Sequence, residues 1–250
     1  QFERLVNASG STEGHIQRPS DGKEPKTVVI IKCVGSRDPN KGVSYCSRAC
    51  CMYSAKHAHQ YLDKVKDGRC FVFYMDVRCA GKGYDEFYMN TLQDGATYVR
   101  GRVSKIYPED GKLVCMGEDT LSSQVVRVDA DMVVLETAMV PSDGSTQIAT
   151  VLNAQRGPEG FFTEAHPKLR PVETNTAGIF LAGVAQGPKD IPDTVAQAGA
   201  AASKVIGLLA KGQIESNPMI VHVNNAKCSG CGACVDICPY GAMQLEEVTL

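Results

Sequence analysis

A cysteine-rich junction between an apolar run and a helical pattern limits the fold of this chain more than any other stretch. The run Thr27–Lys32 is rich in β-branched residues and predicts a strand, while Val43–Val65 has the apolar spacing of a helix. Four cysteines lie across the junction in the pattern C-x12-C-x3-C-C: Cys33, Cys46, Cys50 and Cys51. A strand, a turn and a helix in this order normally begin a dinucleotide-binding sheet.

The turn itself departs from a dinucleotide-binding turn, because it lacks the usual glycines. Within the turn, Gly35 is the only glycine before Gly42. Without close backbone approach and free amides at the helix N-terminus, a pyrophosphate has no evident place to bind. We therefore expect weak or no NAD(P)H binding here. Asp76, at the end of the next predicted strand, could bind a ribose, but a solvated strand end is the favoured interpretation.

The four cysteines suggest a different ligand for the same position in the fold. Cys46 and Cys50 are four residues apart, so on a helix they would share one face. Four thiolates can hold an iron–sulfur cluster, and we predict a cluster where a nicotinamide cofactor would otherwise bind. On this stretch alone two alternatives stay open, which are a tetrathiolate zinc site and a group of inert, buried thiols.

Composition excludes several classes of protein. With 250 residues the chain can form one large or two smaller cores with an appendage. A net charge of −2 and the absence of Trp argue against a nucleic-acid partner. No apolar run approaches the roughly 20 residues of a membrane span. Eleven cysteines, an odd number, fit a reducing cytosol better than a disulfide framework. Because residue 1 is Gln, we expect a fragment or a processed product.

The pattern after the junction predicts an α/β fold with a parallel sheet, followed by a β-meander. Short links join strand and helix in alternation, which favours parallel strands with right-handed crossovers. A hairpin is expected around the turn at Pro108–Gly111. The expected strands and helix are Cys70–Met75, Tyr84–Leu92 (the helix), Tyr98–Tyr107, Lys112–Met116, Val125–Val128 and Met132–Glu136.

A second informative stretch covers residues 174–209. Ile179–Ala182 predicts a short buried strand, and Gly183 after it would allow close backbone approach. Pro192 lies near the start of an Ala- and Gly-rich helix, Asp193–Leu209. Such a helix packs tightly, and its N-terminus would stabilise negative charge on a reduced flavin ring. A merely structural Ala-rich helix is the alternative.

The order of elements resembles the two-dinucleotide-domain flavoproteins of the thioredoxin reductase type. Residues 174–183 are similar to the closing FAD motif of that class, T-x-x-x-G-I-F-x-A-G-D, but Val184 replaces the usual Asp, and Gln186 or Lys189 would have to substitute for it. The resemblance implies that FAD lies against Gly183, Val184, Gln186, Lys189, Ile191, Pro192, Asp193 and Thr194. Since the chain has no G-x-G-x-x-G, we expect the ADP half of the site on a missing N-terminal half or on another polypeptide.

The C-terminus carries the most specific motif of the chain. After a polar linker, Lys211–Ala226, comes C-x2-C-x2-C-x3-C-P, the bacterial ferredoxin run, formed by Cys228, Cys231, Cys234 and Cys238. The first three are expected to ligate one 4Fe–4S cluster. In two-cluster ferredoxins the fourth cysteine serves the other cluster, so Cys238 is expected to do so. We assign no ligand role to Cys70, Cys79 or Cys115.

Together these motifs are similar to the A-type subunit of heterodisulfide reductase over essentially the whole chain. The matching stretches are C-V-G-S-R-D, C-S-R-A-C-C-M-Y-S-x-K-H-A, G-K-G-Y-D-E-F-Y, G-P-K-D-I-P-D-T-V-A-Q-A and the ferredoxin run. The resemblance implies a hetero-oligomeric oxidoreductase component of methanogenesis with FAD and 4Fe–4S clusters. It implies that electron pairs from a hydrogenase or dehydrogenase partner are split at the flavin, one electron going toward ferredoxin and one toward the disulfide-reducing subunits.

The resemblance divides the chain into four segments. They are a linker (1–24), a nicotinamide-domain-like module with the cysteine site (25–140), the C-terminal part of an FAD domain (141–212) and an incomplete ferredoxin domain (213–250). Two other functions stay open. The first is a non-bifurcating iron–sulfur scaffold without flavin chemistry of its own, and the second is an NAD(P)H-dependent flavin oxidoreductase. The terminal acceptor also stays open among a methanogen heterodisulfide, a sulfur compound and another thiol–disulfide couple.

One ion pair is predicted beside the flavin. Lys56 follows Cys50 and Cys51 on the same predicted helix, and Glu3 in the leading segment could be its partner. We hypothesise that this pair supplies protons or charge to the flavin, the alternative being a solvated helix lysine. His57 and His59 are expected to be exposed helix residues, and His166 to belong to loop structure.

Overall fold

The computed structural model describes residues 1–213 and 221–246. The chain divides into two compact units, Gln1–Ile206 and Gly207–Leu250. The predicted ferredoxin segment (213–250) falls in the second unit. Residues 214–220 and 247–250 of that segment, and with them part of the predicted linker Lys211–Ala226, lie outside the described residues. No helix in the described part is long and apolar enough to cross a membrane.

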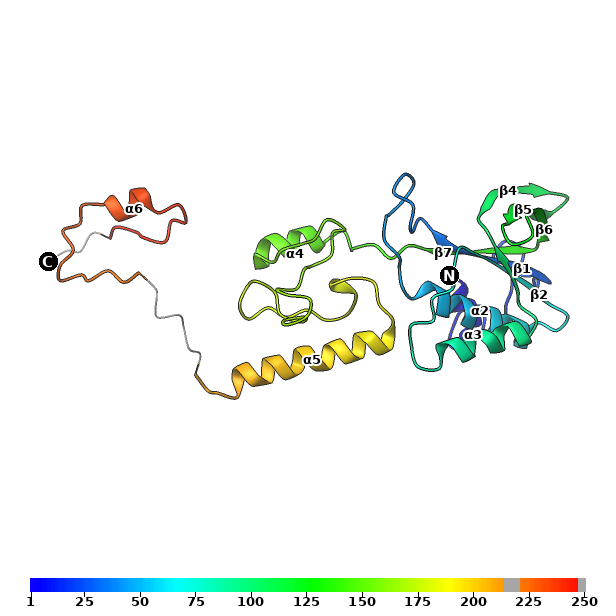
Figure 1. Ribbon diagram of the computed structural model, residues 1–250, viewed down its shortest axis with the longest axis horizontal. Helices are drawn as coiled ribbons and strands as arrows, with labels where there is room; N and C mark the ends of the chain where they lie inside the picture. Colours follow the sequence, from blue (N-terminus) through cyan, green and yellow to red (C-terminus); the bar gives the residue numbers. More distant parts are fainter. Residues whose placement is uncertain (214–220, 247–250) are drawn as a thin grey trace. The chain divides into compact units, whose positions relative to one another are not determined.

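The centre of the first unit is a four-stranded sheet in which every neighbouring pair is parallel (Figure 1). Its strands lie in the order β3 (Thr97–Arg100), β2 (Arg69–Tyr74), β1 (Thr27–Val34) and β7 (Met132–Thr137). Strand β1 is buried on both faces, which explains its apolar run Val28–Ile31. The predicted parallel sheet is therefore confirmed.

Helices cover one face of this sheet. α2 (Cys50–Lys64) packs on β1 and β2, with α1 (Phe2–Val6) and α3 (Tyr84–Gln93) against it. Alternate residues of a strand point to opposite faces, and Val28 and Ile30 join the core on the helical side. Tyr61 of α2 is fully buried, and its hydroxyl donates a hydrogen bond to the Pro25 carbonyl at 2.9 Å.

An antiparallel meander covers the other face, where Val29 and Ile31 join a second core. It consists of β4 (Val103–Glu109), β5 (Lys112–Asp119) and β6 (Gln124–Ala130). The expected hairpin is present, and its turn residues Asp110 and Gly111 have φ of 47° and 75°, as a tight hairpin turn requires. The predicted meander is thus confirmed.

The single strand expected over Tyr98–Tyr107 is wrong, because the chain changes sheets within it. β3 belongs to the parallel sheet and β4 to the meander. The break falls at Gly101, where a Cβ atom would lie 1.8 Å from the Glu118 carbonyl oxygen. Only glycine allows the two backbones to come this close.

The helix expected over Val43–Val65 begins seven residues later, at Cys50. Residues 35–49 instead fold back as a loop, in which the Val43 amide donates to the Gly35 carbonyl at 2.8 Å and the Arg37 amide to the Tyr45 carbonyl at 3.1 Å. Cys46 therefore lies in a loop. The prediction that Cys46 and Cys50 share one helix face is wrong.

Residues 141–209 carry α4 (Ser145–Leu152), a 3₁₀ turn η1 (Gly183–Ala185) and α5 (Ile191–Leu209). α5 begins two residues before the predicted start. The strand expected at Ile179–Ala182 is not present as a strand. Phe180 forms only one isolated bridge, with Glu173, because within residues 1–213 no further strand lies beside it. In the second unit the structure describes one short helix, α6 (Ala233–Ile237).

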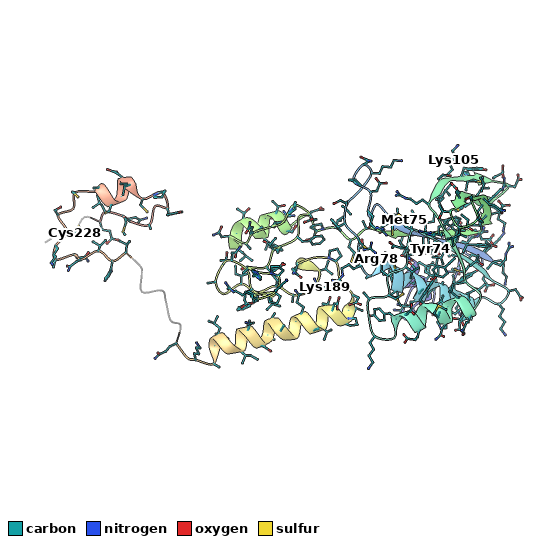
Figure 2. All side chains as sticks on the ribbon, in the orientation of Figure 1. Tyr74, Met75, Arg78, Lys105, Lys189 and Cys228 are labelled. Carbon is teal, nitrogen blue, oxygen red and sulfur yellow. The ribbon has the colours of Figure 1, made fainter. Side chains whose placement is uncertain are left out.

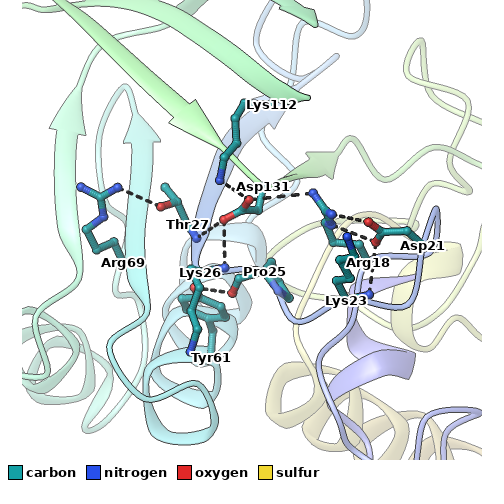
Figure 3. A network of polar contacts seen from close by, with 10 residues as sticks. All are labelled: Arg18, Asp21, Lys23, Pro25, Lys26, Thr27, Tyr61, Arg69, Lys112 and Asp131. Carbon is teal, nitrogen blue, oxygen red and sulfur yellow. Dashed lines mark hydrogen bonds and ion pairs between the residues drawn. The ribbon is translucent and has the colours of Figure 1, made fainter. Parts of the chain in front are cut away.

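A polar network fixes the start of the parallel sheet (Figure 3). The Asp131 carboxylate, only 11% exposed, accepts the Lys26 and Thr27 amides at 2.9 and 2.8 Å and pairs with Lys112. Arg18 lies 3.8 Å away from the same carboxylate. The network joins β1, the meander and the leading segment around one partly buried carboxylate.

Replacing Asp131 with Ala is expected to lower the free energy of unfolding by about 2 kcal/mol, because two backbone amides lose their acceptor. Burial acts to raise the pKa of Asp131, but Lys112 and the two amides outweigh it and the pKa is lowered. The wild-type advantage is thus present at neutral pH and is lost as the pH falls below ~4. Urea unfolding of both proteins at neutral and acidic pH measures this, and an equal difference at every pH would contradict it.

Candidate functional site

Three of the four cysteines from the first junction form one buried group. Cys33 comes from the end of β1, and Cys50 and Cys51 come from the first turn of α2. Tyr53, Met75 (labelled in Figure 2) and Val77 pack against the three thiols. The structure therefore brings together three of the four predicted ligands.

A bulge in β1 directs Cys33 into this group. In a regular strand Cys33 would share the meander face with Val29 and Ile31. The register of β1 with β7 shifts between Ile31 and Val34, and Cys33 has φ of +58°, which costs a non-glycine residue about 1–2 kcal/mol. We interpret this strain as the means by which the thiol is turned toward α2.

Cys46 stands apart from the other three thiols. It is partly buried in the loop, and its Sγ accepts the Arg48 amide at 3.3 Å. Among the described residues, no three His, Cys, Asp or Glu side chains are arranged as a metal site. Four cysteines within a single junction nevertheless fit a tetrathiolate group by their chemistry, with Cys33, Cys50 and Cys51 already adjacent.

Positive charge lies next to the thiols. Lys32 is 6% exposed, and its Nζ donates to the Asp76 carbonyl at 3.1 Å and lies 5.6 Å from the Tyr74 ring centre. Asp76, expected as a solvated strand end, also pairs through its carboxylate with Arg37 at 2.7 Å. Lys32 therefore brings a buried cation to the thiol group from the same strand as Cys33.

Thiolate character is favoured within the group. Interaction with the Cys50 thiol, helped by the charge of Lys32, lowers the pKa of Cys33 to about 7 and that of Cys51 to about 5. The pKa of Cys50 rises, because Cys50 keeps the proton that its two neighbours share. Thiolates are the form that ligates metals, so this environment suits metal binding.

A pocket of about 800 Å³ lies beside the same turn of α2. From α2 it is lined by Met52, Tyr53 and Lys56. The other lining residues are Ala49, Lys82, Gly83, Tyr84, Phe87, Met139, Val184, Lys189, Asp190, Ile191, Pro192 and Thr194. Its volume is typical of a cofactor site, and its walls combine apolar side chains with lysines.

The loop before α5 is held by a buried lysine. Lys189 (labelled in Figure 2) donates to the Gly183 carbonyl at 2.8 Å, the Gln186 Oε1 at 3.1 Å and the Gly187 carbonyl at 2.9 Å. Burial lowers the pKa of Lys189. Gln186 and Lys189, the predicted substitutes for the usual Asp, thus bind each other, while Val184 faces the pocket.

The N-terminus of α5 is capped by Asp190. Its side chain accepts the Asp193 amide at 2.9 Å, and its carbonyl accepts the Thr194 amide at 3.0 Å. Tyr84 donates its hydroxyl to the other Asp190 oxygen at 2.8 Å, which ties α3 to α5. Asp193 pairs with Arg48 at 2.9 Å. Because Asp190 already accepts amides at this end, α5 would act on a group in the pocket through its helix dipole rather than through free amides.

These walls fit the flat ring system of FAD. Met52, Phe87 and Ile191 provide apolar surface, and Lys56 provides positive charge for a reduced, anionic ring. Gly183 has φ of +68°, and a Cβ there would lie 3.1 Å from the Thr194 Cγ2. Glycine thus keeps the loop close to α5, as the sequence pattern predicts.

The predicted contact between Lys56 and Glu3 is present, with Nζ and Oε1 2.6 Å apart.

His57, expected to be exposed, is only 5% exposed, so that prediction is wrong. Its Nε2 lies 2.6 Å from the Glu3 Oε2 and its Nδ1 3.1 Å from the Glu136 Oε1. His59 is exposed on the outer side of α2, as predicted. The sequence signal for this buried histidine was Glu136, a charged residue at the end of the apolar run MVVLE that requires a buried polar partner.

The last motif lies in the second unit. Cys228 (labelled in Figure 2), Cys231 and Cys234 are exposed, and Cys238 is partly buried. Gly230 and Gly232, between the cysteines, have φ of 70° and 76°, which lets the backbone turn between successive thiols. The Ala242 amide donates to the Cys238 Sγ at 3.4 Å and lowers the pKa of that thiol. This donor set fits a 4Fe–4S cluster.

The remaining cysteines take the places predicted for them. Cys70 in β2 and Cys115 in β5 are buried, and Cys79 is partly buried in a loop. Burial raises the pKa of Cys70 to about 12 and that of Cys115 to about 11. These strand thiols therefore stay protonated and apolar.

Comparisons with known proteins show which proteins this chain is similar to. The 4Fe-4S binding domain family matches residues 221–244. The chain is 50% identical, over 99% of its length, to the second A-type iron-sulfur subunit of the CoB–CoM heterodisulfide reductase of Methanopyrus kandleri. It is 46% identical, again over 99% of its length, to the A-type subunit of the H₂/formate:CoB-CoM heterodisulfide,ferredoxin reductase of Methanococcus maripaludis. The chain spans 38% of the length of each relative.

Among solved structures, a thioredoxin reductase of T. acidophilum is similar to the chain. The match has a TM-score of 0.49 and 17% sequence identity, and it covers 73% of this chain and 52% of that one.

Proposed function

Since this chain is homologous to a segment of the A-type subunit of heterodisulfide reductase, we propose that it is the flavin- and cluster-bearing electron-transfer segment of an oxidoreductase component of that kind. One cluster would be held by Cys33, Cys46, Cys50 and Cys51. Another would be held by Cys228, Cys231 and Cys234, with Cys238 serving a further cluster. FAD would lie with its ring system in the 800 Å³ pocket.

The observation that carries this proposal is that the first turn of α2 contributes residues both to the thiol group and to the pocket. Cys50 and Cys51 of α2 join the thiol group, while the next residues, Met52 and Tyr53, line the pocket. Tyr53 takes part in both, because it packs against the thiols and faces the pocket. A cluster on these thiols and a ring in this pocket would be neighbours, which is what electron transfer between them requires.

The chain's own residues would prepare this site for electron transfer. FAD, when bound, supplies the exchange between electron pairs and single electrons, and clusters carry single electrons. Phe87, Ile191 and Pro192 would keep water from the ring. Lys56 would hold a positive charge, or deliver a proton, at the edge of the pocket, with Glu3 fixing its ammonium group. Lys32 would stabilise the electron-rich cluster with its buried charge.

The partners follow from the relatives and belong to the same proposal. We expect a hetero-oligomer with other heterodisulfide reductase subunits, a hydrogenase or dehydrogenase that delivers electron pairs, and ferredoxin as one acceptor. Bifurcation at the flavin is the expected use of these partners. The ADP half of FAD would bind to protein outside this chain.

Cofactor analysis of the complete protein that carries this sequence tests the proposal. The protein is purified anaerobically, and FAD, iron, acid-labile sulfide and zinc are measured. We expect bound FAD, iron and sulfide, and little response to titration with NADH or NADPH. Absence of FAD would contradict the flavin site and favour an iron–sulfur scaffold, whereas tight nicotinamide binding would favour an NAD(P)H-dependent oxidoreductase.

A further inference from the structure

A continuous chain of hydrogen bonds connects four charged or titratable side chains in the first unit. The Lys56 ammonium donates to one oxygen of Glu3 at 2.6 Å, and the other oxygen of Glu3 lies 2.6 Å from the His57 Nε2. On the opposite side of the imidazole, Nδ1 lies 3.1 Å from the Glu136 carboxylate. Both ring nitrogens of His57 are therefore engaged by carboxylates.

The inner half of this chain is shielded from solvent. His57 and Glu136 are each 5% exposed. The imidazole lies between the Phe2 ring, 5.0 Å away in an edge-on arrangement, and the Tyr53 ring, 5.9 Å away. A buried histidine and a buried carboxylate exchange protons with water slowly unless hydrogen-bonded partners carry them.

The two ends of the chain open onto different cavities. Lys56 lines the 800 Å³ pocket, whereas Glu3, His57 and Glu136 line a second cavity of about 580 Å³. Tyr53 lines both cavities. The hydrogen-bond chain thus leads from the second cavity to the pocket, with His57 and Glu136 buried and with Glu3 and Lys56 about half exposed.

We propose that His57 relays protons between Glu136 and the Lys56–Glu3 pair, so that the pocket receives protons from the second cavity. This inference rests on the proposed flavin in that pocket and adds His57 and Glu136 to the groups that serve it. Neither residue lines the pocket itself, so they act through Lys56 and Glu3.

The relay moves a proton without any change in electron count. Glu136 passes a proton to Nδ1 of a neutral imidazole, and Nε2 gives a proton to Glu3, so His57 ends neutral in its other tautomer. Glu3 passes the proton to Lys56 once the lysine has lost one to the pocket. Rotation of the imidazole ring, which exchanges the positions of its two nitrogens, resets His57, and Glu136 takes its next proton from the second cavity that it lines. The titratable groups around His57 are Glu3 from α1, Tyr53 and Lys56 from α2, and Glu136 from β7. Gln1 also lines the second cavity.

Two variants of the complete, FAD-loaded protein test the relay. His57→Gln and Glu136→Gln keep polar side chains of similar size but cannot pass protons along this path. His59→Gln is the matched control, since His59 lies on the same helix, exposed and bonded to Asp94 instead. Flavin reduction by dithionite is followed by stopped flow in H₂O and D₂O across a pH series, with an indicator dye reporting proton uptake.

We expect both variants to keep wild-type FAD and iron content and to lose roughly 10- to 100-fold in the rate of proton uptake, a typical loss for a proton-transfer group. Their solvent isotope effect and pH profile should change, while His59→Gln matches wild type. Unchanged uptake and pH profiles in FAD-loaded His57→Gln and Glu136→Gln would overturn the relay alone. A wild-type protein without FAD would instead overturn the flavin site, and the relay with it.

Discussion

Cys50→Ser is expected to abolish metal binding at the first cysteine site. Cys50 is 1% exposed and is the thiol that lowers the pKa of both Cys33 and Cys51, so we take it as the central thiol of the group. Serine keeps the shape but is a poor ligand for iron at neutral pH. We expect the variant to lose all iron of that site, about four atoms per chain if the site holds a cubane cluster. Anaerobic iron and sulfide assays with EPR of the reduced protein measure the loss.

A matched control separates ligand loss from damage to the core. Cys70 is equally buried, in β2, and we assign no ligand role to it. Cys70→Ser should keep the iron content of the wild type, and the C-terminal ferredoxin signal should survive in both variants. Loss of zinc instead of iron in Cys50→Ser, or no change of metal, would show that the Cys33–Cys51 junction is not a cluster site.

Lys56→Ala is expected to lower turnover of the complete enzyme about 100-fold and to make the flavin harder to reduce. The ammonium group lines the pocket and is held 2.6 Å from Glu3, so its removal takes away a positive charge and a proton donor at once. Positive charge stabilises a reduced, anionic ring, so the flavin potential should fall. Anaerobic redox titration and turnover of the reconstituted complex measure the two effects.

Two further variants sharpen the test of Lys56. Lys105 (labelled in Figure 2) is a lysine of β4 that does not line this pocket, so Lys105→Ala should match wild type. Glu3→Gln should reproduce part of the loss of turnover, and the double variant should lose little more turnover than Lys56→Ala if the two residues act as one pair. Unchanged flavin potential and turnover in Lys56→Ala would refute the role of the pair.

Local patterns in the sequence predicted much of the fold. The strand β1 was recognisable because burial on both faces requires an unbroken apolar run. The hairpin at Asp110 and Gly111 was recognisable because its turn needs residues that accept positive φ. The ferredoxin motif could be recognised because the spacing of its cysteine ligands along the chain defines a 4Fe–4S site. Each of these signals lies within a few neighbouring residues.

The start of α2 could not be predicted, because contacts with distant residues decide it. Tyr45 donates its hydroxyl to the Met139 carbonyl at 2.9 Å, and Ser47 accepts the Met139 amide at 2.9 Å. These bonds hold residues 43–49 in a loop although their apolar spacing suits a helix. The same limit explains Cys46, which was placed on the helix, and His57, whose carboxylate partner Glu136 is 79 residues away in the sequence.

The bulge at Cys33 shows a further limit of sequence patterns. Alternation along β1 would place this thiol on the meander face, and nothing in the residue types announces the shift in register. Only the three-dimensional structure reveals that Cys33, Cys50 and Cys51 form one group. The thiol constellation was thus predictable as a set of residues, but its geometry was not.

The central claim is that a cluster on Cys33, Cys46, Cys50 and Cys51 lies beside a flavin in the adjoining pocket, and EPR of the flavin radical tests it most directly. The complete protein is titrated anaerobically, and the microwave power saturation of the radical is compared between wild type and Cys50→Ser. A neighbouring paramagnetic cluster would speed relaxation, so we expect the wild-type radical to saturate at much higher power than the variant's. Equal saturation in the two proteins, with FAD bound in both, would contradict the claim.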